Sequence, residues 1–101
     1  MPKMHLIVDH RLSQDEALKR VQGLLEDLSS RYSDQIKDLH QEPWDDNKCQ
    51  FSFSAGGFSV SGTLTVTSSN VELLGNLPLA ASLFKGKIES TIRKRAEELL
   101  A

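Results

Sequence analysis

The chain has 101 residues, which is enough for a two-layer core, and we expect a single domain over residues 1–101. Its 39% hydrophobic and 26% charged residues are typical of a globular protein and exclude the disordered class. The formal net charge of −2 gives no overall attraction to nucleic acid or anionic membranes. The single cysteine, Cys49, excludes an internal disulfide.

The first residues, MPKMHLIVDH, are too short and too often charged to form a signal peptide, and no run is apolar enough to span a bilayer. We therefore expect a cytoplasmic protein without a transmembrane segment or a nucleic-acid partner.

Two elements are predicted in the first third of the chain. Met4 to Val8 form a short apolar run of strand length. Ser13 is followed three residues later by Glu16, a capping pattern that places the start of a helix at Gln14. One apolar stripe then follows at helical spacing along a single helix, through Ala17, Val21, Leu24, Leu25, Leu28 and Tyr32.

The middle of the chain predicts an antiparallel meander. The segment 36–44 has no clean period, and we assign it as a strand that Pro43 ends at a sheet edge. After a polar turn at 45–48, residues 49–55 alternate, and Gly56-Gly57 supply the positive φ angles of a tight hairpin. Residues 58–67 alternate strictly, break at Ser69-Asn70 and resume over 71–74.

A long helix is predicted from Leu79 to Ala101. At 100° per residue, one wedge collects Ala81, Phe84, Ile88, Ile92, Ala96 and Leu99, and Arg95 projects into the same wedge. The order of elements is strand, helix, three or four antiparallel strands, and long helix. It predicts an α+β fold in which a curved antiparallel sheet carries both helices on one face. In outline this arrangement resembles a reduced helix-grip fold.

Residue chemistry does not indicate an enzyme. His5, His10, His40 and Cys49 are the candidate transition-metal ligands, but no two stand at a spacing that converges on one ion. The Asp45-Asp46-Asn47 cluster lacks the remaining residues of a calcium loop, and the Gly57-to-Ser61 string lacks the second glycine of a nucleophile elbow. We expect no catalytic residues, no metal site and no cofactor.

Two features leave alternatives open. If the layer between helix and sheet leaves a gap, Arg95 would bind the carboxylate of a fatty or hydroxy acid there. In the alternative, the aliphatic part of its side chain packs against the core while the guanidinium reaches water. A row of small hydroxyl side chains makes a flat, uncharged surface that is either solvated or pairs with a second copy. Its members are Ser59, Ser61, Thr63, Thr65 and Thr67.

Several short motifs in joint order resemble the putative polyhydroxyalkanoic acid system family over nearly the full length. They are His10-Arg-Leu12 before Glu16-Ala17, Trp44 with Asp45-Asp46, Phe51 and Phe53, Gly62-Thr-Leu64-Thr-Val66, Val71-Glu-Leu73, Leu77-Pro78, and Phe84-Lys-Gly86-Lys-Ile88-Glu89 with Ile92. The resemblance implies a context of polyester storage granules or acyl metabolism, and no mechanism. Each motif also has a packing interpretation: we expect Trp44 to close one end of the core with its indole nitrogen hydrogen-bonded.

The leading hypothesis is a non-enzymatic accessory protein of the polyhydroxyalkanoate system that binds a granule surface or a granule protein. One alternative is a small carrier or sensor for a hydrophobic acid held between sheet and C-terminal helix. In that case Arg95 is the anchor, and Trp44 and Phe84 are further ligand-binding residues. The other alternative is a structural homodimer.

Overall fold

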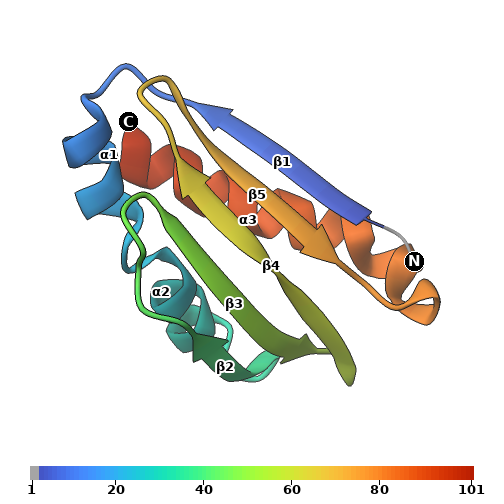
Figure 1. Cartoon of the computed structure of the whole chain (residues 1–101). Helices are drawn as coiled ribbons and strands as arrows, with labels where there is room; N and C mark the ends of the chain where they lie inside the picture. Colours follow the sequence, from blue (N-terminus) through green and yellow to red (C-terminus); the bar gives the residue numbers. More distant parts are fainter. Residues whose placement is uncertain (1–2) are drawn as a thin grey trace.

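The sheet has five antiparallel strands in a computed structural model that describes residues 3–101 (Figure 1). In chain order they are β1 (Lys3–Asp9), β2 (Ile36–Gln41), β3 (Lys48–Ala55), β4 (Phe58–Val66) and β5 (Asn70–Asn76). Strands β2 to β5 form an antiparallel meander of four strands, where the sequence predicted three or four, and β1 pairs with β5, so the spatial order is β1-β5-β4-β3-β2. The edge strands are therefore β1 and β2.

The helical elements lie together on one face of this sheet (Figure 1). They are α1 (Gln14–Val21), α2 (Leu24–Arg31), the 3₁₀ helix η1 (Leu79–Phe84) and α3 (Lys85–Leu100). Helix α3 packs along β1, α2 packs on β2, and α1 contacts both α3 and β4. The predicted α+β fold, with helices on one face of an antiparallel sheet, is confirmed.

Strict alternation determines which strand residues face the helices. Along β4, Val60, Leu64 and Val66 are buried while Ser59 and Ser61 are exposed. The same period places alternate residues of β1, β3 and β5 in one hydrophobic core, including Met4, Leu6, Val8, Phe51, Phe53, Val71 and Leu73. Burying this face against the helices is the main stabilising term.

The predicted start of the first helix is confirmed. Helix α1 begins at Gln14, and the Ser13 hydroxyl accepts a hydrogen bond from the Glu16 backbone N–H at 3.1 Å. The reciprocal half of the capping box is not made through the Glu16 carboxylate, which instead accepts a hydrogen bond from Arg20 at 3.1 Å.

The prediction of one continuous helix after Gln14 is wrong. Helix α1 ends at Val21, and α2 begins at Leu24 after a break at Gln22 and Gly23. Gly23 has φ −97° and ψ 6°, a conformation outside the helical well. On either side of the break, α1 contacts α3 and β4, whereas α2 contacts β2 and α3. The predicted apolar stripe is buried on both pieces.

Glycines make the sharp geometry of the central hairpin. Gly56 and Gly57 have φ angles of 59° and 84°, as the predicted tight turn requires.

A second pair of glycines lies within β4 and β5. Gly62 pairs directly with Gly75 of β5, and a Cβ at Gly62 would collide with the carbonyl oxygen of Leu74. This glycine pair permits the close approach and curvature of β4 and β5.

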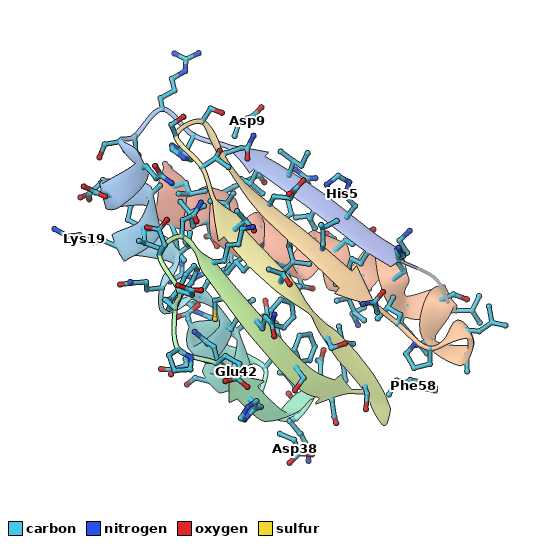
Figure 2. The ribbon with its side chains drawn as sticks, in the orientation of Figure 1. His5, Asp9, Lys19, Asp38, Glu42 and Phe58 are labelled. Atoms are coloured by element: carbon cyan, nitrogen blue, oxygen red, sulfur yellow. The ribbon has the colours of Figure 1, made fainter. Side chains whose placement is uncertain are left out.

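A β-bulge explains why residues 36–44 show no clean period. Lys37 pairs with Ser54 and His40 pairs with Ser52, so Asp38 and Leu39 together oppose one residue of β3. Asp38 takes a positive φ of 55°, and Figure 2 shows it at the outer edge of the molecule. The strand also ends at Gln41, so Trp44 lies outside it, contrary to the prediction.

The prediction of one uniform helix that begins at Leu79 is wrong. Residues Leu79–Phe84 form the 3₁₀ helix η1, and the α-helix proper runs over Lys85–Leu100. Its buried residues are Ile92, Ala96 and Leu100, whereas Leu99 is only partly buried. The tighter 3₁₀ turn rotates the residues before Lys85 away from the α-helical wheel used for the prediction.

Candidate functional site

An apolar pocket lies where α2, β2, the end of β3 and α3 meet. Its volume is about 310 Å³, at the small end of the range for ligand pockets. Buried side chains form its floor: Leu25, Leu28, Phe53 and Ile92. Partly buried or exposed apolar residues form its walls: Tyr32, Ile36, Leu39, Ala55, Phe84 and Ile88.

The bulge in β2 helps to build this pocket. In an unbroken strand, Ile36 and Leu39 would point to opposite faces of the sheet. The extra residue at the bulge restores Leu39 to the same face as Ile36, and both line the pocket. The pocket therefore depends on a local irregularity that the apolar pattern alone does not display.

The rim of the pocket carries the polar groups. Asp34 and Gln35 lie in the turn between α2 and β2, and Lys87 and Thr91 lie on α3. The Thr91 hydroxyl already donates to the Lys87 backbone carbonyl at 2.9 Å. Among the described residues, neither Asp34 nor Lys87 belongs to an ion pair. The rim thus offers one carboxylate and one ammonium without a fixed partner.

Exposed apolar side chains project from η1, next to the pocket. Leu83 is 90% exposed, Leu79 77% and Phe84 49%. The Phe84 ring lies 6.2 Å from the ring of Phe58 at the start of β4, which Figure 2 places at the same end of the molecule as η1. We call Leu79, Leu83 and Phe84 the apolar end. All three belong to one six-residue element, and exposed apolar side chains gathered in this way are candidates for an interaction site.

Arg95, the predicted anchor for an acid, is not among the residues that line the apolar pocket. Its Nε donates to the Asp27 carboxylate at 2.7 Å, and Glu98 lies 3.8 Å from its Nη1. The hydrogen bond from Arg95 holds the pKa of Asp27 below its ordinary value, and the same contact raises the pKa of Arg95. The guanidinium is thus occupied in joining α3 to α2.

The other two predicted ligand-binding residues lie apart. Phe84 lines the pocket, whereas Trp44 is not among its lining residues and packs against the core near the end of β2. The Trp44 indole nitrogen is buried and has no hydrogen-bond partner, contrary to the prediction, and the buried Gln41 side-chain oxygen also lacks one. Arg95, Trp44 and Phe84 therefore do not share one site.

The histidines are held apart by separate structural contacts. His10 is buried and joins two loops: its Nε2 lies 3.0 Å from the Thr67 carbonyl, and its Nδ1 accepts from the Leu12 N–H at 3.1 Å. His5 pairs with Glu72 at 2.8 Å on the outer face of the sheet, and His40 pairs with Glu42 at 3.2 Å. Within residues 3–101 no group of three or more candidate ligands could hold a metal ion.

Cys49 and the hydroxyl row take structural places in the sheet. Cys49 is buried on β3, its thiol donates to the Glu42 carbonyl at 3.2 Å, and burial raises its pKa. The hydroxyl row of β4 lies on the face turned away from the helices, where Ser59 and Ser61 are exposed and Thr63 and Thr65 are partly exposed. None of the helices built from residues 3–101 is both long and apolar enough to cross a bilayer.

The sequence pattern did not predict Leu79, Leu83 and Lys87 as functional residues. A signal for the two leucines was present, because on the helical wheel they fall opposite the predicted apolar wedge. Lys87 could not be recognised, because its place at the pocket rim depends on the position of α2 and β2 relative to α3.

Comparison with known proteins identifies the family. Residues 4–100 match the family described as "Putative polyhydroxyalkanoic acid system protein". The chain therefore belongs to this family, as the resemblance in its motifs predicted.

The chain is similar to a solved structure at low sequence identity. The crystal structure of TTHA0849 from Thermus thermophilus matches with a TM-score of 0.42 and 14% identity, over 98% of this chain and 92% of that one. Identity at this level carries no information about ligands or activity. No curated protein matched the chain.

Proposed function

We propose that this member of the polyhydroxyalkanoic acid system family is a non-enzymatic accessory protein that attaches to the surface of a cytoplasmic polyester granule through its apolar end. The single observation that supports this proposal is the exposure of Leu79, Leu83 and Phe84 on one short segment. Family membership supplies the polyester context.

The exposed side chains have a physical reason to seek an apolar surface. Burying a leucine or phenylalanine side chain completely is worth about 1.5–3 kcal/mol, and the three of them lie within six residues. Part of that gain is lost to the cost of fixing the protein at the surface. The balance of these terms favours weak, reversible attachment over permanent attachment, and the short 3₁₀ helix presents the side chains without unfolding of the core.

The outer face of the sheet is a weaker candidate for this attachment. Its large exposed apolar residues are Ile7, which is 41% exposed, and Leu74, which is 48% exposed. Polar neighbours surround them, including the paired His5 and Glu72. This face therefore supplies a matched control position rather than the docking surface.

Co-sedimentation with isolated granules tests the proposal. Native granules and granules stripped of their proteins are each incubated with wild-type protein, with a Leu79→Ser and Leu83→Ser double variant, and with Leu74→Ser. We expect wild type and Leu74→Ser to sediment with both granule preparations, and the double variant to remain in the supernatant.

Two results would contradict this proposal. Sedimentation only with native granules would show that a granule protein is the partner instead of the surface itself. Equal sedimentation of wild type and the double variant would show that the apolar end is not the docking surface. Circular dichroism of each variant checks that it is folded.

A further inference from the structure

We infer that the apolar pocket binds a single-chain carboxylic acid, with the alkyl chain between α2, β2 and α3 and the carboxylate at Lys87. The acid is taken up from solution, which is a function separate from attachment to granules. Its anchor is a residue on the pocket rim and not Arg95, where the sequence predicted it.

The lining determines the nature of the chain. Apart from the Tyr32 hydroxyl, the floor and walls are apolar side chains, and Asp34, Gln35 and Lys87 are exposed residues of the lining. A ligand that fills it must therefore be apolar along most of its length, because an unpaired polar group there would lose its hydration without compensation. A volume of about 310 Å³ suits one alkyl chain better than the two chains of a membrane lipid.

Two features of α3 favour a negatively charged end group. Its first turn carries no acidic residue and instead carries Lys85 and Lys87. Helix η1 runs directly into α3, and the Lys85 backbone N–H already donates to the Ser82 carbonyl, so the side-chain charge of Lys87 is what favours an anion here. Lys87 lies at the rim, and no described residue pairs with it.

The other charge on the rim sharpens the prediction. Asp34 approaches from the α2–β2 turn, and it would repel a carboxylate that entered on its side. The acid should therefore bind on the α3 side of the mouth, near Lys87. Removing Asp34 should strengthen binding of an acid, whereas removing Lys87 should weaken it. Opposite responses to these two changes are expected only for an anion.

Calorimetric titration of the full chain, without granules, provides the test. The probes are decanoate, the neutral 1-decanol and the cationic decyltrimethylammonium ion, with the two ions below their micelle concentrations and the alcohol below its solubility limit. We expect decanoate to bind most tightly and the cation least. Along a series of shorter saturated acids, affinity should fall by roughly fourfold for each methylene removed, as full burial of a methylene predicts.

Surface variants locate the carboxylate. Lys87→Met should weaken decanoate binding by about two- to fivefold, an effect that added salt reduces, and leave decanol unchanged. Asp34→Asn should strengthen decanoate binding. Ala55→Phe, which fills the pocket from β3, should abolish binding of all probes. Leu83→Ser is the matched control, because this side chain is exposed outside the pocket lining.

The outcomes are distinct. If no probe binds, the pocket is not a ligand site. If acid and alcohol bind equally and Lys87→Met changes neither, the carboxylate assignment is wrong. Leu83 belongs to the apolar end and not to the pocket lining, so the two proposals are tested independently. Granule attachment can fail while acid binding succeeds, and acid binding can fail while granule attachment succeeds.

Discussion

Glycine supplies the clearest test of packing at the level of single residues. At Gly62 a Cβ would overlap the Leu74 carbonyl and the Gly75 backbone, which cannot move without separating β4 from β5. We expect Gly62→Ala to cost about 3 kcal/mol or more of unfolding free energy. Gly86 is the control, because it lies in α3 and a Cβ added there would meet no atom within 4 Å, so Gly86→Ala should stabilise by about 0.5–1 kcal/mol. Urea unfolding measures both changes, and a small loss at Gly62 would contradict the close approach of the strands.

The residues that carry the family resemblance mostly have structural roles. His10 fixes the loop after β1 to the turn between β4 and β5, and Gly62 permits the contact of β4 with β5. Gly86 has no such explanation, since no neighbouring atom requires a missing side chain there. It lies two residues after Phe84, and a stabilising Gly86→Ala substitution would show that its presence has a reason other than folding.

At the level of elements, α3 presents two isoleucines with different surroundings. Ile92 is 3% exposed and belongs to the core, whereas Ile88 is partly buried and borders the pocket. We expect Ile92→Ala to cost about 2–5 kcal/mol, and Ile88→Ala to cost less than half as much, since its side chain already faces open space. Thermal or denaturant unfolding compares them. Equal losses would mean that the pocket closes in solution.

The contact between α2 and α3 predicts a dependence on acid pH. The pKa of Asp27 is lowered first by its hydrogen bond from Arg95 and then by Arg31, against desolvation, which raises it. A carboxyl whose pKa is lower in the folded state stabilises the fold at pH values above its ordinary pKa, which is 3.8 for Asp27. That contribution is lost as the pH falls through the lower folded value. The stability difference between wild type and Asp27→Asn should therefore be constant near neutral pH and disappear in strong acid.

Melting temperatures measured across the acid range test this sign. Glu98→Gln is the control, because Glu98 lies farther from Arg95, at 3.8 Å, and is 54% exposed. It should change the acid profile little. A difference between wild type and Asp27→Asn that grows toward low pH would contradict the assignment.

Elements with a clean period were predictable, and interrupted ones were not. Alternation around Gly56-Gly57 predicted the β3–β4 hairpin, because side-chain direction in a strand follows directly from residue number. The break at Gly23 and the bulge at Asp38 fit a helix and a strand to the curved sheet. Both irregularities therefore depend on tertiary packing, which the local sequence pattern does not show. The apolar stripe of the first helix survived the break because both pieces face the same core.

At the scale of the whole molecule, the candidate site depends on how α2 and α3 lie against each other, which the sequence does not show. Phe84 was predicted to contact a ligand and does line the pocket, yet Arg95 in the same wedge of the wheel reaches Asp27 instead. The difference arises because α2 supplies a carboxylate at that turn of α3, and a helical wheel contains no neighbouring helix. Pocket and apolar end share Phe84, so one end of the molecule carries both candidate surfaces.

The elongated shape of the molecule predicts that it binds a granule by one end. The molecule measures 38 × 23 × 22 Å, and Figure 1 places η1 and the β4–β5 turn at opposite ends of the sheet. Docking by the apolar end should bury Ser82 of η1 and leave Ser69 of that turn in water. Ser82→Cys and Ser69→Cys, each made with Cys49→Ala, can carry a polarity-sensitive fluorophore, because both serines are exposed.

On binding to stripped granules, the emission of the Ser82→Cys conjugate should shift to the blue, while that of the Ser69→Cys conjugate should not. The sheet and helix layers then stand away from the surface, and the outer face of the sheet stays accessible to other molecules. A shift at both positions would mean that the protein lies flat on the granule. A shift only at Ser69→Cys would place the docking surface at the other end, beside the loops that His10 joins.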